Sequence, residues 1–157
     1  MRRTSLQALL AAALLTALLP QAYALWSEVQ LTPKHLAFDN LTFTIKTKEV
    51  EKLTGFEVTV TPKAGKKLSP FLAARLSIAS ADTFVGTVPV EEKRAEDGSV
   101  RYWFRVSPKF LSNSRFDFDA GNYVEVKGKP PHPKFEQIMG GSSYWFFLRD
   151  FAALARP

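Results

Sequence analysis

The sequence predicts an all-β fold built from short antiparallel strands. Apolar and polar residues alternate with a period of two along most of the chain after residue 25, and no segment keeps a helical period for three turns. Turn residues recur between the alternating segments, roughly every ten residues. Some seven to nine strands at roughly this spacing are typical of an immunoglobulin-like β-sandwich, with a small up-and-down β-barrel as the alternative.

The alternation and the turns between the segments define the expected strands. Segment 41–48 alternates without a fault, and Asp97-Gly98 predicts a hairpin turn before a strand at 100–106. Ala120-Gly121-Asn122 predicts another hairpin, between strands 115–119 and 123–127. The remaining expected strands are 26–31, 56–61, 74–79, 84–90 and 144–148.

Residues 1–24 are predicted to be a cleaved secretory signal peptide, and 25–157 a single domain. Arg2 and Arg3 precede an uncharged apolar run, Leu6–Leu19, and Ala22 and Ala24 are the small residues that a signal peptidase requires at −3 and −1. The run is shorter than the roughly 20 residues that span a bilayer. We therefore expect an exported protein, periplasmic or secreted, with no transmembrane segment after cleavage.

Composition excludes several classes of protein. A chain with 46% hydrophobic and 13% aromatic residues is not disordered. The absence of cysteine excludes disulfides, thiol catalysis and Cys-ligated zinc. The net charge of +6 includes two arginines of the predicted signal peptide, and the remaining positive charge suits an anionic envelope surface or simple solubility. Two loops, 62–67 and 127–134, are rich in lysine. They are expected at opposite ends of the fold, so we predict no nucleic-acid partner.

The residues that could carry catalysis are few, so we predict a non-enzymatic protein with no cofactor. The two histidines, His35 and His132, are expected at opposite ends of the fold, and no serine lies in a nucleophile motif. The one candidate metal site is weak: Asp117 and Asp119 alternate on the predicted hairpin and present oxygens that calcium prefers. The simpler interpretation is a hairpin with its phenylalanines inward and its aspartates outward.

Aromatic and basic residues on one strand form the candidate binding surface. In segment 100–106 the alternation places Arg101, Trp103 and Arg105 on the outer face, where an indole can stack on a ring and guanidiniums can hold an anion. The competing interpretation is structural, since arginine stems often cover an aromatic on the outside of a sandwich. Trp145 alternates similarly in the last strand, and we expect it to join Trp103 in one patch.

These observations favour an exported domain that binds a protein or a cell-envelope component. One alternative is a small-molecule or lipid carrier with an apolar cavity, which would require a closed barrel. The other is a calcium-dependent protein that uses the Asp117/Asp119 hairpin. The sequence leaves the partner and the oligomeric state open.

Overall fold

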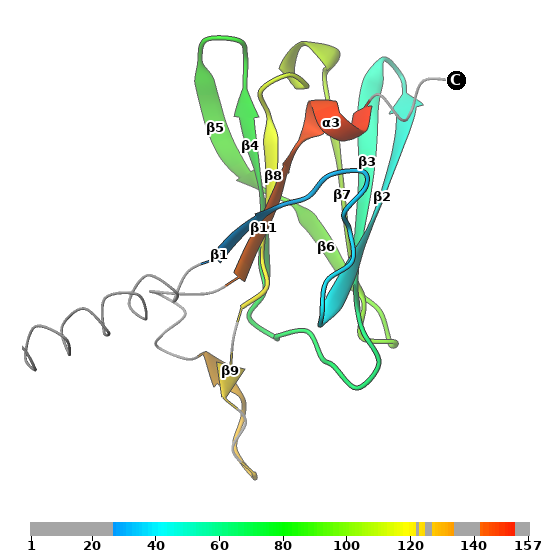
Figure 1. Cartoon of the computed structure of the whole chain (residues 1–157). Helices are drawn as coiled ribbons and strands as arrows, with labels where there is room; N and C mark the ends of the chain where they lie inside the picture. The colour runs from blue at the N-terminus through cyan, green and yellow to red at the C-terminus, as the bar shows by residue number, and fades with distance from the viewer. Residues whose placement is uncertain (1–26, 122, 125–126, 134–141, 153–157) are drawn as a thin grey trace, which may run out of the picture.

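The computed structural model describes residues 27–121, 123–124, 127–133 and 142–152, so the predicted signal peptide lies outside the described part of the chain. Nine strands form two facing sheets rather than a closed barrel, which confirms the predicted sandwich (Figure 1). Within the described residues, no helix has the length and apolar character needed to cross a membrane.

The two sheets have the strand neighbours of an immunoglobulin-like domain. The first sheet has the order β1 (Ser27–Gln30), β11 (Ser142–Phe147), β8 (Arg115–Asp119), β4 (Ala73–Ala79) and β5 (Phe84–Pro89). The second sheet has the order β2 (Leu41–Val50), β3 (Leu53–Pro62), β7 (Val100–Val106) and β6 (Glu91–Arg94). Apart from β1, the strand order β11-β8-β4-β5 of the first sheet corresponds to strands G, F, C and C′ of an immunoglobulin-like domain. The order β2-β3-β7-β6 of the second sheet corresponds to strands A, B, E and D. Strand β1 is an addition and pairs with β11 in parallel, unlike every other pair in the two sheets.

The hairpin predicted between 115–119 and 123–127 is wrong. Strand β8 lies inside the first sheet and pairs with β4 on one side and β11 on the other, so neither of its edges is open to a hairpin partner. Strand β9 (Tyr123–Val124) pairs instead with β10 (His132–Pro133) in a separate two-residue ladder. Gly121, with φ +58°, provides the turn by which the chain leaves β8.

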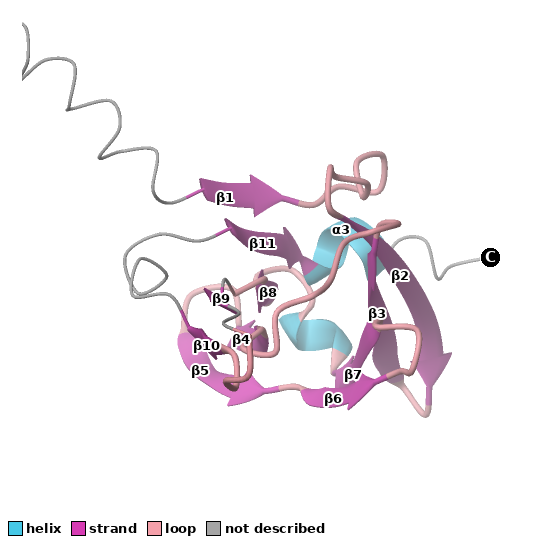
Figure 2. Cartoon of the chain, turned by 90° about the horizontal axis from the view of Figure 1, so that it is seen from below, coloured by secondary structure: helices cyan, strands magenta, loops and turns pink. Residues whose placement is uncertain are grey.

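The predicted turn at Asp97-Gly98 is confirmed, and the charged segment before it is strand β6. Gly98 adopts φ +83°, which favours glycine. The Asp97 carboxylate accepts hydrogen bonds from the N–H and the hydroxyl of Ser99, at 2.9 and 2.6 Å. These bonds lower the pKa of Asp97. Figure 2 shows β5 continuing into β6, so that one connection crosses from the first sheet to the second along one side.

A chain of phenylalanine rings joins the two sheets through the core. Phe56 and Phe104 of the second sheet stack with their centroids 5.1 Å apart, and Phe104 stacks on Phe116 of the first sheet at 5.6 Å. Phe116 contacts Phe146 at 5.2 Å, and Phe146 contacts Phe151 at 4.7 Å. Aromatic pairs of this kind add about 0.5–1.5 kcal/mol each beyond the apolar area that they bury.

Two short helices close one end of the sandwich. They are a 3-10 helix, Pro108–Phe110, and helix α3, Leu148–Ala152, which buries Leu148 and Phe151 completely. Ser114 connects this end to the first sheet: its hydroxyl accepts the N–H of Ala79 at 3.1 Å and its carbonyl accepts the N–H of Leu148 at 3.0 Å. Hydrogen bonds as well as aromatic contacts therefore hold this end of the sandwich to the core.

Candidate functional site

Strand β7 presents the candidate residues on the outer face of the second sheet, in the direction that the sequence predicts. Val100, Tyr102 and Val106 are buried between the sheets. On the other side of the strand Arg101 and Arg105 are exposed, and Trp103 is half-buried. This face is open to a ligand, and its arrangement depends on the neighbouring strands.

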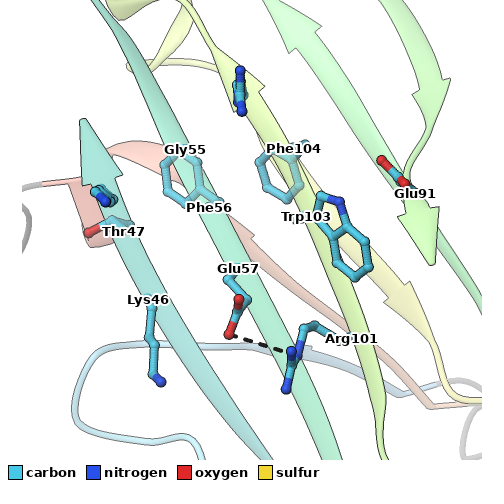
Figure 3. Close-up of a pocket in the computed structure, with 11 residues that line it drawn as sticks. Lys46, Thr47, Gly55, Phe56, Glu57, Glu91, Arg101, Trp103 and Phe104 are labelled. Atoms are coloured by element: carbon cyan, nitrogen blue, oxygen red, sulfur yellow. Dashed lines mark ion pairs between the residues drawn. The ribbon is translucent and has the colours of Figure 1, made fainter. Parts of the chain in front are cut away.

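An open groove with a volume of about 950 Å³ runs over the outer face of β2, β3 and β7 and reaches β6 (Figure 3). Lys46 and Lys48 line it from β2, Gly55 and Glu57 from β3, and Glu91 from β6. The stacked rings of Phe56 and Phe104 lie behind the strands. This volume lies at the upper end of what is usual for sites that bind small molecules.

Gly55 leaves the middle of the groove without a side chain. Along this row of the sheet Lys48 pairs with Gly55, and Gly55 pairs with Arg105. Because neighbouring strands are about 4.8 Å apart, the backbones of Lys48 and Arg105 lie roughly 10 Å from each other across the glycine. The row therefore places one cation on each side of a floor made of backbone.

The next row holds the indole. Lys46 pairs with Glu57, Glu57 with Trp103, and Trp103 with Glu91. The Glu57 carboxylate lies 3.8 Å from the Arg101 guanidinium, and their side chains are 40% and 55% exposed. An ion pair this exposed contributes little to stability. Arg101 nevertheless offsets part of the negative charge of Glu57. The residues that line the groove include four cations and two carboxylates, so its net charge is positive.

Trp145 does not join Trp103, and the expectation of one shared patch is wrong. Trp145 is on β11 in the first sheet, whereas Trp103 is in the second sheet, and their outer faces point in opposite directions. The Arg115 guanidinium lies 4.6 Å from the centre of the Trp145 ring, and Phe147 contacts the same ring at 5.3 Å. Trp145 thus has the structural environment in which arginine covers an aromatic.

Asp117 and Asp119 point outward from β8, as predicted, but they flank no hairpin. Arg115 donates hydrogen bonds from Nε, at 2.8 Å, and from its terminal nitrogen to one oxygen of Asp117. Asp119 accepts the N–H of Gly121 at 3.0 Å. Within the described part of the chain, no three His, Asp or Glu side chains are grouped so that they could share a metal ion.

Sequence reasoning missed the residues that turn the β7 face into a groove: Lys46, Lys48, Gly55, Glu57 and Glu91. The alternation of 41–48 does place both lysines on one face, but it does not tell which strand lies beside them. The predicted strand 56–61 began one residue after Gly55, because a glycine weakens a strand pattern. A glycine within a strand is nevertheless a signal of close approach by a ligand or another backbone.

Comparison with protein-family models, with curated proteins and with solved structures finds no match.

Proposed function

We propose that this protein is an exported, non-enzymatic domain that binds an anionic sugar of the cell envelope in the groove of the second sheet. The observation that carries the proposal is the row Lys48–Gly55–Arg105 beside Trp103. It combines two cations, a glycine between them and a flat aromatic surface within one open groove.

Each part of this arrangement suits one part of an acidic sugar. Arg105 can donate two parallel hydrogen bonds to a carboxylate or phosphate, and Lys48 adds a second charge from the opposite side. The indole of Trp103 offers an apolar surface on which the face of a sugar ring can pack. Gly55 allows the ring to approach the backbone, because no Cβ stands between them.

The alternatives receive less support from this geometry. A carrier with an internal cavity was expected to be a closed barrel, whereas the chain forms two facing sheets whose interior holds the phenylalanine rings. A protein partner with an acidic surface would meet the same cations. It differs from a sugar in that it would cover the exposed rim of the groove as well as its floor.

The test is a titration of the purified protein with trigalacturonate, a carboxylated sugar oligomer, followed by the NMR signals of the tryptophan indole N–H groups. We expect the Trp103 signal to shift and the Trp145 signal to stay in place, because the two indoles lie on opposite faces. Maltotriose, a neutral oligomer of the same length, should cause a much smaller shift. Binding should weaken as salt is added, because the contacts are ionic.

Charge reversal within the groove provides the matched comparison. Lys48→Glu and Arg105→Glu should each weaken binding by about tenfold or more, since a hydrogen bond to a charged group contributes about 1.5–3 kcal/mol. Arg75→Glu makes the same change in net charge on the first sheet and should leave binding unaltered. If all three variants lost affinity equally, the loss would follow from the change in net charge alone, and the groove would be refuted as the binding site.

A second arm separates the sugar from a protein partner. A photo-crosslinking amino acid replaces Lys46 at the rim, and irradiation of living cells follows. We expect crosslinks to carbohydrate-bearing material. Recovery of a single protein near stoichiometric amount, together with no response to trigalacturonate, would overturn the sugar proposal in favour of a protein partner.

A further inference from the structure

The first sheet has one edge, strand β5, that is unlike the other edges of the sandwich. β5 is the outermost strand of its sheet, so one side of its backbone has no partner strand within the described part of the chain. Residues 83–90, which contain the strand, carry no charged side chain. A sheet edge without charge is a template for another strand.

Three of the exposed large apolar side chains belong to this edge strand. Phe84 is 64% exposed, Val85 61% and Val88 44%. Phe71, at 40%, lies just before β4, the strand that pairs with β5. Among the described residues these four are the large hydrophobic side chains with such exposure, and three of them belong to β5.

The other edges carry the charged residues that discourage strand pairing. All four residues of β6 are charged and exposed. Strand β2 presents Lys46, Lys48 and Glu49 to solvent, and β1 presents Glu28. Natural sheets protect their edges with charges of this kind, whereas β5 has no charge and only a register shift near Phe84 and the proline at its end.

We propose that β5 pairs antiparallel with β5 of a second copy of this chain, which joins the two first sheets across a twofold axis. A twofold contact brings the same surface together with itself, so a charged strand risks placing like charges opposite each other. An uncharged strand rich in β-branched residues meets no such repulsion, and β5 is one. This contact does not involve the groove, so the failure of one proposal leaves the other standing.

The pairing is short and the dimer is therefore expected to be weak. Pro89 has no N–H to donate, which limits the ladder to at most Phe84–Val88, and the register of β5 against β4 shifts between Gly86 and Phe84, so that the strand is irregular at Val85. Five paired residues and their exposed side chains bury less than the roughly 1,200–2,000 Å² of a stable interface. We expect dimerisation that depends on protein concentration over the micromolar to millimolar range.

Sedimentation velocity of the purified protein over this range tests the proposal. The wild type should change from monomer to dimer as its concentration rises. Val85→Lys and Val88→Lys should raise the dissociation constant by tenfold or more, whereas Thr44→Lys, which adds the same charge to edge strand β2, should leave it unchanged. A wild type that stays monomeric throughout, or a dimer that survives both β5 lysines, would overturn the proposal.

The absence of cysteine allows a second measurement that also maps the contact. Single cysteines are placed in turn at Phe84, Val85, Gly86, Thr87 and Val88, and each protein is oxidised. An antiparallel twofold pairing should give disulfide-linked dimers at only one or two neighbouring positions, those nearest the axis, and Thr44→Cys should give none. Equal linking at all five positions, or at Thr44, would indicate random collision and contradict the pairing.

Discussion

Tyr102 offers the sharpest test of how the core is packed, because its hydroxyl is buried without a hydrogen-bond partner in the described part of the chain. The side chain is completely buried, and its oxygen has no hydrogen-bond partner among the described residues. Glu92 lies opposite it across β6 and β7 and accepts a hydrogen bond from Arg94 at 3.0 Å, but its carboxylate is not placed to accept one from the Tyr102 hydroxyl. Leaving a buried hydroxyl unsatisfied costs about 1–3 kcal/mol. We expect Tyr102→Phe to raise the free energy of unfolding by about 1 kcal/mol at pH 7, since it removes the oxygen and keeps the ring.

Alkaline pH should enlarge this difference. Burial, reinforced by the nearby Glu92 carboxylate, raises the pKa of Tyr102 well above its usual value. At pH values above about 10 the unfolded chain therefore loses the tyrosine proton while the folded chain keeps it, and stability falls as the pH rises. The loss from this residue amounts to about 1.4 kcal/mol at pH 11, from 1.36 kcal/mol per pH unit. Tyr102→Phe removes that loss, so its advantage over the wild type should grow from about 1 to about 2.4 kcal/mol between pH 7 and 11.

Urea unfolding at both pH values, followed by circular dichroism, measures this difference. Tyr144→Phe is the control: burial and Asp39 raise the pKa of Tyr144 as well, so it should also reduce the alkaline loss. Tyr144 is not among the buried groups without a partner, so its replacement should bring no gain at pH 7. A Tyr102→Phe protein that is less stable than the wild type at pH 7 would show that the hydroxyl is hydrogen-bonded. A difference in the free energy of unfolding that stays constant from pH 7 to pH 11 would refute the raised pKa of Tyr102.

Three further substitutions test the turn, the cap and the ring chain, each by urea unfolding. Gly121→Ala should cost more stability than Gly65→Ala: both glycines have positive φ, but a Cβ at Gly121 would lie 3.0 Å from the Phe71 carbonyl and one at Gly65 would meet nothing within 4 Å. Equal costs would mean that this contact relaxes freely. Ser114→Ala should cost about 1–3 kcal/mol, because the N–H of Ala79 loses its acceptor. Phe116→Ala should cost about 3–5 kcal/mol, since the ring links both sheets, and a cost below 1 kcal/mol would contradict its central place in the core.

The strands and the faces of their side chains could be predicted because they depend on local sequence. Period-two alternation is set by the backbone, in which successive side chains point to opposite faces of a sheet. The burial of Val100, Tyr102 and Val106 and the outward direction of Arg101 and Trp103 follow from it directly. The sandwich class follows from the number and spacing of such segments, which a single chain of this length packs most simply as two layers.

The pairing of the strands could not be predicted, because it depends on residues far apart in the sequence. Segment 115–119 precedes a glycine turn and a second alternating segment, which together are the local pattern of a hairpin. In the fold both edges of β8 are taken by β4 and β11, and the local preference is overridden. Register errors of this kind change which side chains become neighbours, so they affect a predicted site more than a predicted fold.

The two tryptophans of β7 and β11 show what this means for function. Both occupy outward positions of their strands, so they look alike in sequence, and in the fold each has an arginine nearby on the same face. Arg115 lies over the Trp145 ring and is itself held by Asp117, which leaves that face filled. Beside Trp103 the adjacent strand contributes Gly55, and Arg105, its partner in the row, is left facing an empty floor. The difference between a structural tryptophan and a candidate binding tryptophan therefore lies in one glycine of the neighbouring strand, and it can be seen only when the pairing of β3 with β7 is known.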